Sequence, residues 1–244
     1  MIKQFNSPSF RPLYDQIKVL ITQSLIAGEW KPGEAIPSEM ELAVRFKVSQ
    51  GTVRKAIDEL SAENILVRRQ GKGTYVATHN EEVIKLRFLR LAAANGKKEL
   101  LESELLEFSR GKANGEVAAM LDIKSGTATL EVKRLLSFSG RPLIHDHIII
   151  PASPFKGLNA ARVQENKGSM YSMYETQYGI HMVRAEERLK AVAADNEVAQ
   201  NLGLPVGSPL LSITRVSYTY GDKPMEWRLG LCVTDDHHYM NELE

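Results

Sequence analysis

Basic side chains that could bind a polyanion are concentrated in one short part of the chain. Residues 45–72 hold seven Lys or Arg against three Asp or Glu, a net charge of +4. Residues 1–78 hold eleven basic against eight acidic side chains, and residues 79–244 hold twenty against twenty-two. A mildly basic end on a mildly acidic body predicts a polyanion-binding module joined to a second unit.

Three helices are expected to position these basic residues. Pro12 opens a first helix with apolar residues at helical spacing, and Gly28 ends it. Ser38 and Glu41 have capping-box spacing at the start of a second, short helix. Ser49 is expected to cap a third helix, whose apolar residues form one inner face.

A basic hairpin follows the third helix. Residues 65–67 and 74–76 are short apolar runs, and the turn between them carries three cations and two glycines. Helix, helix, turn, helix and hairpin together predict a winged helix-turn-helix.

The third helix and the hairpin tip carry the candidate DNA-binding residues. A helix N-terminus can enter a major groove, and glycines at a hairpin tip let the backbone approach phosphates closely. The candidates are Arg45, Ser49, Gln50, Thr52, Arg54, Lys55, Arg69, Gln70, Gly71 and Lys72. Any one of the charged residues could simply be a solvent-exposed surface residue. All of the candidates occur in the order expected for a recognition helix followed by a wing, and this order favours double-stranded DNA as the partner.

The same segment resembles the GntR family of bacterial transcription regulators over about residues 10–78. The resemblance rests on residues 37–39, 42–43, 46–49, 52–56, Leu60 and 71–76. It implies a homodimer on a two-fold-related operator, with the third helix in the major groove and the wing beside it.

Two positions depart from the family pattern. Arginine is common in the family where this chain has Met40 and Gln50, and in relatives those arginines read guanine. A glutamine amide suits adenine N6 and N7. The sequence therefore predicts an adenine opposite Gln50.

The rest of the chain contains an internal repeat. Residues 116–140 align with residues 197–221 at an offset of 81, and eight of the 25 pairs are identical. Each copy is expected to form a helix, a strand, a glycine-containing turn and a return strand. We therefore expect an α+β chain, with an N-terminal winged helix-turn-helix at 1–78, a linker at 79–86, and an α+β domain built on a duplicated antiparallel sheet at 87–244.

This second part resembles the UTRA effector domain of the HutC-type branch of the GntR family. The resemblance rests on ordered motifs at residues 134–135, 140–142, 151, 155–158, 169–171, 178–179, 187, 191, 202, 209–211 and 224–226. It implies self-association and a small-molecule pocket whose occupation changes the affinity for DNA.

The resemblance also implies the effector-binding residues. It places ligand contacts at Arg134, Asp146, Ser169 and Tyr171. An arginine fork suits a carboxylate or phosphate, and a serine at a helix start suits an anion. Glu187 and Glu226 are further candidates for an ammonium or hydroxyl group, although each acid could simply pair with an arginine.

The expected effector is a small anion or zwitterion. The family's frequent second arginine, two positions after Arg134, is Leu136 in this chain. Its loss weakens the prediction of a sugar phosphate and leaves other carboxylate- or phosphate-bearing metabolites open.

Other functional classes fit the residues less well. His145 with His147, and residues 235–238, suggest a metal, but they lack a characteristic ligand spacing. The single cysteine, Cys232, sits in an apolar strand and is expected to pack inertly. Trp30, Trp227 and several methionines could line a ligand box, but core packing is the better interpretation.

The sequence thus favours a cytoplasmic, ligand-responsive transcription regulator over an enzyme. No membrane-spanning stretch, signal peptide or catalytic motif is visible, and neither a cofactor nor a resident metal is expected. Repression is expected when the unliganded protein occupies its operator. Activation is the alternative, because whether a bound regulator represses or activates transcription depends on where the operator lies.

Overall fold

The computed structural model describes residues 11–78, 90–97, 99–166 and 169–241. The chain separates into two compact units, residues 1–78 and 79–244. The expected linker at 79–86 lies outside the described residues. None of the described helices is long and apolar enough to cross a membrane.

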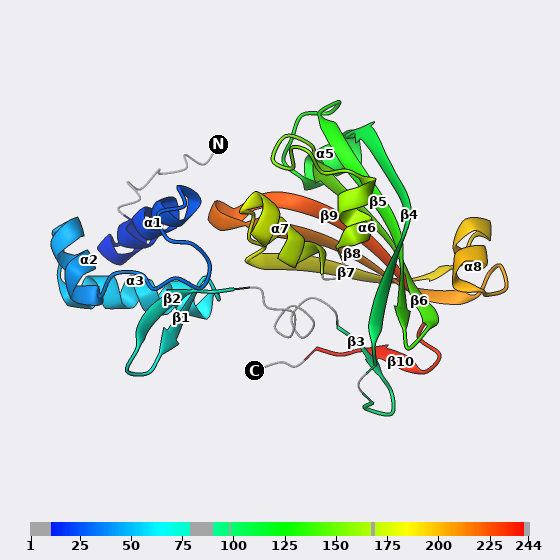
Figure 1. Ribbon diagram of the computed structural model, residues 1–244, viewed down its shortest axis with the longest axis horizontal. Coiled ribbons are helices and arrows are strands. Elements are labelled where there is room, and N and C mark those ends of the chain that lie inside the picture. Colours follow the sequence, from blue (N-terminus) through cyan, green and yellow to red (C-terminus); the bar gives the residue numbers. More distant parts are fainter. Residues whose placement is uncertain (1–10, 79–89, 98, 167–168, 242–244) are drawn as a thin grey trace, which may run out of the picture. The chain divides into compact units, whose positions relative to one another are not determined.

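The N-terminal unit is a three-helix winged fold (Figure 1). Its helices are α1 (Leu13–Ile26), α2 (Glu39–Phe46) and α3 (Gln50–Ala62), and its wing consists of β1 (Leu66–Arg69) and β2 (Gly73–Val76). Apolar side chains from all three helices are buried together; they include Ile17, Ile21, Leu42, Val53, Ile57 and Leu60. The expected winged helix-turn-helix is confirmed.

Local capping determines where α2 and α3 begin. Ser38 accepts from the backbone of Glu41, and the Glu41 carboxylate accepts from the Ser38 backbone at 2.8 Å, which completes a capping box. Ser49 caps α3 by accepting from the backbone N–H of Thr52 at 3.2 Å. Both caps agree with the sequence-based prediction.

The second unit is built on a six-stranded antiparallel sheet with the order β4-β5-β6-β9-β8-β7 (Figure 1). The strands are β4 (Leu101–Lys112), β5 (Ala128–Phe138), β6 (Arg141–Pro151), β7 (Arg184–Ala193), β8 (Pro209–Thr219) and β9 (Lys223–Cys232). Short strands β3 (Leu91–Ala93) and β10 (His237–Tyr239) pair separately. The expected α+β fold is therefore confirmed.

The duplication appears directly in the sheet. One copy consists of α5 (Gly115–Met120), β5 and β6, and the other of α8 (Asn196–Leu202), β8 and β9. The two hairpins meet in the middle, where β6 pairs with β9. The repeated units therefore supply the four central strands.

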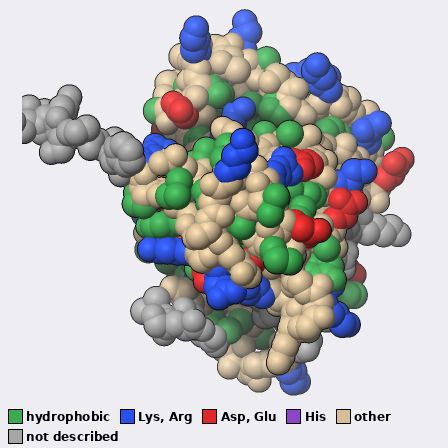
Figure 2. Space-filling view, turned by 90° about the vertical axis from the view of Figure 1, so that its left-hand side faces the viewer, with side chains coloured by type: hydrophobic (Ala, Val, Ile, Leu, Met, Phe, Trp, Pro, Cys, Tyr) green, Lys and Arg blue, Asp and Glu red, His purple; other side chains and the backbone are tan. Residues whose placement is uncertain are grey.

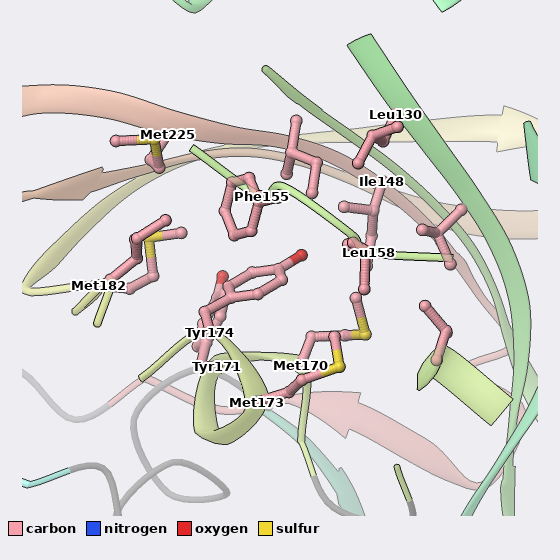
Figure 3. Close-up of a cluster of buried hydrophobic side chains, with 14 residues drawn as sticks. Leu130, Ile148, Phe155, Leu158, Met170, Tyr171, Met173, Tyr174, Met182 and Met225 are labelled. Carbon is pink, nitrogen blue, oxygen red and sulfur yellow. The ribbon is translucent and has the colours of Figure 1, made fainter. Parts of the chain in front are cut away.

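Helices pack on both faces of the sheet. On one face, α6 (Ala160–Glu165) and α7 (Met170–Tyr178) cover apolar strand residues such as Val132 and Ile148 (Figure 3). On the other face, α5 packs around Ile149, and a hydrogen bond from Lys133 to Glu197 joins β5 to α8. Met170, Met173 and Met182 belong to the buried cluster under α7, as the core-packing interpretation predicts.

Candidate DNA interface and effector site

The start of α3 presents polar residues at the surface. Ser49 and Thr52 hydrogen-bond to each other through their hydroxyls at 2.8 Å, so both help to shape the first turn. Gln50, Arg54 and Lys55 are exposed. The Lys55 ammonium lies 3.9 Å from the centre of the Tyr14 ring, which leaves its charge at the surface while anchoring its stem.

The wing has a tip that a nucleic acid can approach closely. Gly71 and Gly73 have φ angles of 70° and 104°, a backbone region that favours glycine, and no atom lies near the place of a side chain at either position. The Arg69 guanidinium stacks 4.3 Å from the Tyr75 ring, and Gln70 and Lys72 are exposed beside it. This tip offers two cations and open backbone to phosphates.

Arg45 differs from the other DNA-binding candidates because it is engaged within its own unit. Its guanidinium pairs with Glu29, with one of the two hydrogen bonds at 2.9 Å, and it also lies over the Trp30 ring. Figure 2 shows Lys and Arg side chains spread over one face of the molecule, with acidic side chains among them.

The effector candidates centre on a carboxylate held between two arginines. Asp146 of β6 is fully buried and accepts from Arg134 Nε at 2.7 Å and from Arg228 Nε. Burial alone would raise the pKa of Asp146, but the two guanidiniums outweigh burial and hold that pKa below its ordinary value. Among the described residues, the terminal Nη atoms of Arg134 and Arg228 have no hydrogen-bond partner.

A second buried carboxylate, Glu226 of β9, faces α7. Tyr171 and Tyr174 donate their hydroxyls to its two oxygens at 2.8 and 2.9 Å, and Tyr171 also bonds to Ser217 at 2.8 Å. Burial raises the pKa of Glu226 despite the opposing effects of Arg228 and the tyrosines, and burial raises the pKa of Tyr171 to about 12. Figure 3 shows both tyrosines on α7, within the apolar cluster that excludes water from their hydroxyls.

Glu187 lies farther along the same sheet face, on the edge strand β7. It accepts from Arg215 Nε at 2.7 Å and also from the Tyr239 hydroxyl. Burial opposes ionisation, but Arg215 outweighs it and lowers the pKa of Glu187. Glu187 therefore belongs to an ion pair of its own, linked to the rest through Arg215, which also interacts with Tyr171.

Ser169 caps α7 and accepts from the backbone of Ser172 at 3.1 Å.

Four of the six sequence-predicted effector residues form one buried polar cluster: Arg134, Asp146, Tyr171 and Glu226. The sequence reasoning missed Arg228, Arg215, Tyr174 and Ser217 as members. The available signal was period-two spacing, which puts Arg228 and Glu226 on one strand face.

The metal alternative has no support from the described residues, which contain no group of three or more potential metal ligands. His147 bonds to Glu131 at 3.3 Å, and His237 lies between Asp236 and Glu99, each at 2.7 Å. Cys232 is buried, and burial raises the pKa of its thiol to about 12. A neutral, buried thiol of this kind is inert.

A winged helix joined to a domain with a buried, charge-bearing sheet face defines a two-part transcription regulator. Residues 13–76 match the family described as bacterial regulatory proteins, gntR family, and residues 96–238 match the UTRA domain. The chain belongs to the GntR family of transcription regulators, with a UTRA domain as its second part. It is a DNA-binding regulator and not an enzyme.

Relatives match both parts of the chain. The HTH-type transcriptional regulator YurK of Bacillus subtilis is 31% identical over 237 residues, covering 94% of this chain and 95% of that protein. The HTH-type transcriptional repressor NagR of Bacillus subtilis is 29% identical and covers 98% of each chain. The ligand-binding domain of a protein assigned to the GntR family, from Bordetella bronchiseptica, is 42% identical with a TM-score of 0.63, covering 65% of this chain and 98% of that one.

Proposed function

We propose that this regulator is a cytoplasmic homodimeric repressor, released from its operator by a small molecule that carries a carboxylate or phosphate. The observation that carries the effector class is the pair of arginines on Asp146, of which Arg134 is buried and Arg228 is half-buried. Each arginine donates its Nε–H to the aspartate, and the Nη donors of each have no hydrogen-bond partner among the described residues. Two such forks suit a planar or tetrahedral anion.

The remaining polar groups suit a second feature of the ligand. Glu226 and the hydroxyls of Tyr171 and Tyr174 lie on the same sheet face as the two arginines. Because the cluster already contains carboxylates as well as guanidiniums, a ligand with both an anionic group and a hydroxyl or ammonium group matches it better than a bare anion. The name of NagR as a repressor supports the proposed sign of regulation.

DNA binding is proposed to use α3 and the wing tip. Arg54→Ala should weaken binding to a duplex selected from a random library, and wild-type affinity should fall steeply as salt rises. Affinity that is insensitive to both changes would contradict this interface.

Gln50→Arg should change the preferred base at one position of the selected site, and an unchanged preference there would contradict the adenine prediction.

A thermal-shift screen of the full chain against amino acids, dicarboxylates, sugar phosphates and phosphonates tests the effector site. A binding compound should raise the melting temperature in a dose-dependent way, and the rise should disappear in Arg134→Ala. Arg184→Ala removes an exposed arginine of the same sheet and should keep the response. A compound that stabilises both variants equally would overturn the assignment of the site.

The hit from that screen should also weaken DNA binding by the wild-type chain. Coupling of about 1–3 kcal/mol is typical of allosteric regulators and corresponds to a readily measured loss of affinity.

Sedimentation of the free and DNA-bound chain tests the homodimer. A monomer on a two-fold-related operator would contradict that part of the proposal.

A further inference from the structure

Glu39, the first residue of α2, is an acidic residue within the DNA-binding surface. Its side chain is only 14% exposed, whereas its partners Arg54 and Arg68 are 57% and 42% exposed. An acid in this place repels phosphates, so a DNA-binding unit gains nothing from it as a surface charge. Its contacts point to another role.

Three donors from two other elements converge on this carboxylate. Arg54 of α3 donates through Nε to Oε2 at 2.9 Å, and its Nη2 forms an ion pair with the same oxygen at 2.9 Å. Gln50 Nε2 donates to that oxygen at 3.3 Å. Arg68 of the wing strand β1 donates through Nη1 to Oε1 at 2.9 Å. Its Nη2 reaches Asp58 of α3 at 2.7 Å, which ties the wing to the recognition helix a second time.

The neighbouring acid Glu41 shows that helix capping does not explain Glu39. Glu41 bonds to the backbone and hydroxyl of Ser38 and so stabilises the start of its own helix. Glu39 is directed away from its own helix toward α3 and β1. Burial would raise the pKa of Glu39, but the hydrogen bonds from Arg54, Arg68 and Gln50 outweigh burial and lower it.

We propose that Glu39 is a positioning residue for base reading. It fixes the side chains of Gln50 and Arg54 before DNA arrives, and it fixes the wing strand to the same point. Because Gln50 turns its Nε2 toward Glu39, its carbonyl oxygen lies on the opposite side of the amide and can accept from a base amino group. Because the charge of Arg54 is partly neutralised by Glu39, Arg54 is attracted less strongly to the phosphates of DNA, whatever the base sequence.

The proposal separates specific from non-specific binding. Glu39→Gln keeps the size of the side chain but loses the charge that orients both arginines. The variant should bind a scrambled duplex at least as tightly as the wild type, with a steeper salt dependence as Arg54 becomes free to contact a phosphate. The ratio of affinities for the wild-type-selected duplex and the scrambled duplex should fall by about tenfold.

Glu59→Gln is the matched control, because it removes the same charge from the far half of α3. It should leave the affinity ratio unchanged, and melting temperatures of both variants show whether the unit remains folded. If Glu39→Gln and Glu59→Gln change the ratio equally, the effect is one of net charge and the proposal fails.

A double-mutant cycle with Arg54→Ala tests whether Glu39 acts through its partner. In the Arg54→Ala background, Glu39→Gln should lower the affinity ratio much less than it does in the wild type. Losses that add in full would show that Glu39 does not act through Arg54. A Glu39→Gln variant with wild-type discrimination and wild-type salt dependence would overturn the proposal outright.

Discussion

The two hairpins of the duplicated sheet carry the same arginine in different electrostatic settings. Arg134 of β5 and Arg215 of β8 are aligned by the repeat and lie 81 residues apart. Across its hairpin, Arg134 faces Asp146, whereas Arg215 faces another arginine, Arg228. Arg215 therefore takes its carboxylate from Glu187 of the neighbouring strand β7.

One additional turn residue accounts for this difference. The first hairpin closes between Phe138 and Arg141 with two residues in its turn, and the second closes between Thr219 and Lys223 with three. The repeat offset would place Trp227 at the position of Asp146. The additional residue shifts the return strand by one, which turns Trp227 to the opposite face and brings Arg228 onto the charged face.

The shift creates the candidate effector site. Arg228 becomes the second cation on Asp146, and Glu226, two residues earlier on the same strand, comes onto the same face. On this face the first hairpin supplies Arg134 and Asp146. The second supplies Arg215, Arg228 and Glu226, and Glu187 of β7 is the counter-charge of Arg215. An effector anion is expected at the Nη donors of Arg134 and Arg228, which make no hydrogen bond among the described residues.

Removal of the shared carboxylate should break this arrangement most severely. Asp146→Ala leaves Arg134 and Arg228 without their buried counter-charge. We expect the free energy of unfolding to fall by about 3–5 kcal/mol, measured by urea denaturation of the full chain.

An exposed ion pair of the same sheet serves as the control for Asp146→Ala. Glu186, whose side chain is 56% exposed, pairs with Arg184. Glu186→Ala should therefore cost less than about 1 kcal/mol. Equal losses in the two variants would show that the central pair is no more important than a surface one.

Disruption of the ion pair at the second hairpin should have a smaller effect. Arg215→Leu leaves Glu187, but that side chain is 14% exposed and keeps its bond from Tyr239, so the expected loss is about 1–3 kcal/mol. Arg215→Leu combined with Glu187→Leu should recover part of this loss, since an apolar pair leaves no buried charge. A double variant that is no more stable than Arg215→Leu alone would contradict this.

The two central acids should respond to pH in opposite directions. The pKa of Glu226 is raised in the folded state, so its contribution to stability is complete below about pH 4.5 and is lost as the pH rises through the folded pKa. The pKa of Asp146 is lowered, so its contribution is present above its ordinary value of 3.8 and is lost as the pH falls through the folded pKa.

Glu226→Gln isolates the first of these two effects. The stability of the variant relative to the wild type should increase as the pH rises from about 4.5 to the raised folded pKa of Glu226, by at most about 1.4 kcal/mol per pH unit. Urea denaturation at several pH values measures this difference. A difference that is flat or falls with pH would show that Glu226 ionises without a penalty.

Local features of both units could be predicted from the sequence, and contacts between distant strands could not. The caps at Ser38 and Ser49 and the arrangement of each hairpin depend on neighbours a few residues apart. The bond from Arg228 to Asp146 depends on the pairing of β6 with β9 and on a turn longer by one residue, and the spacing of residues within β9 indicates neither of these. Glu39 was equally hidden, because its partners are 11, 15 and 29 residues away.

The turns themselves give the finest test of the comparison, because each places two successive residues at positive φ. Ser139 and Gly140 have φ angles of 51° and 81°, and Gly221 and Asp222 have 71° and 56°. Serine is a poor residue for this left-handed region, whereas asparagine adopts it readily and an Asn-Gly pair favours the two-residue hairpin turn.

Ser139→Asn should therefore raise the free energy of unfolding by a few tenths of a kcal/mol, up to about 1 kcal/mol, as measured by denaturation. Ser137→Asn, in the adjoining strand β5, is the matched control and should lower it, because strands disfavour asparagine. If both variants shift stability in the same direction, the tightness of the two-residue turn does not limit the first hairpin. The different return strands would then depend on the sheet pairing of β6 with β9 and not on the turns.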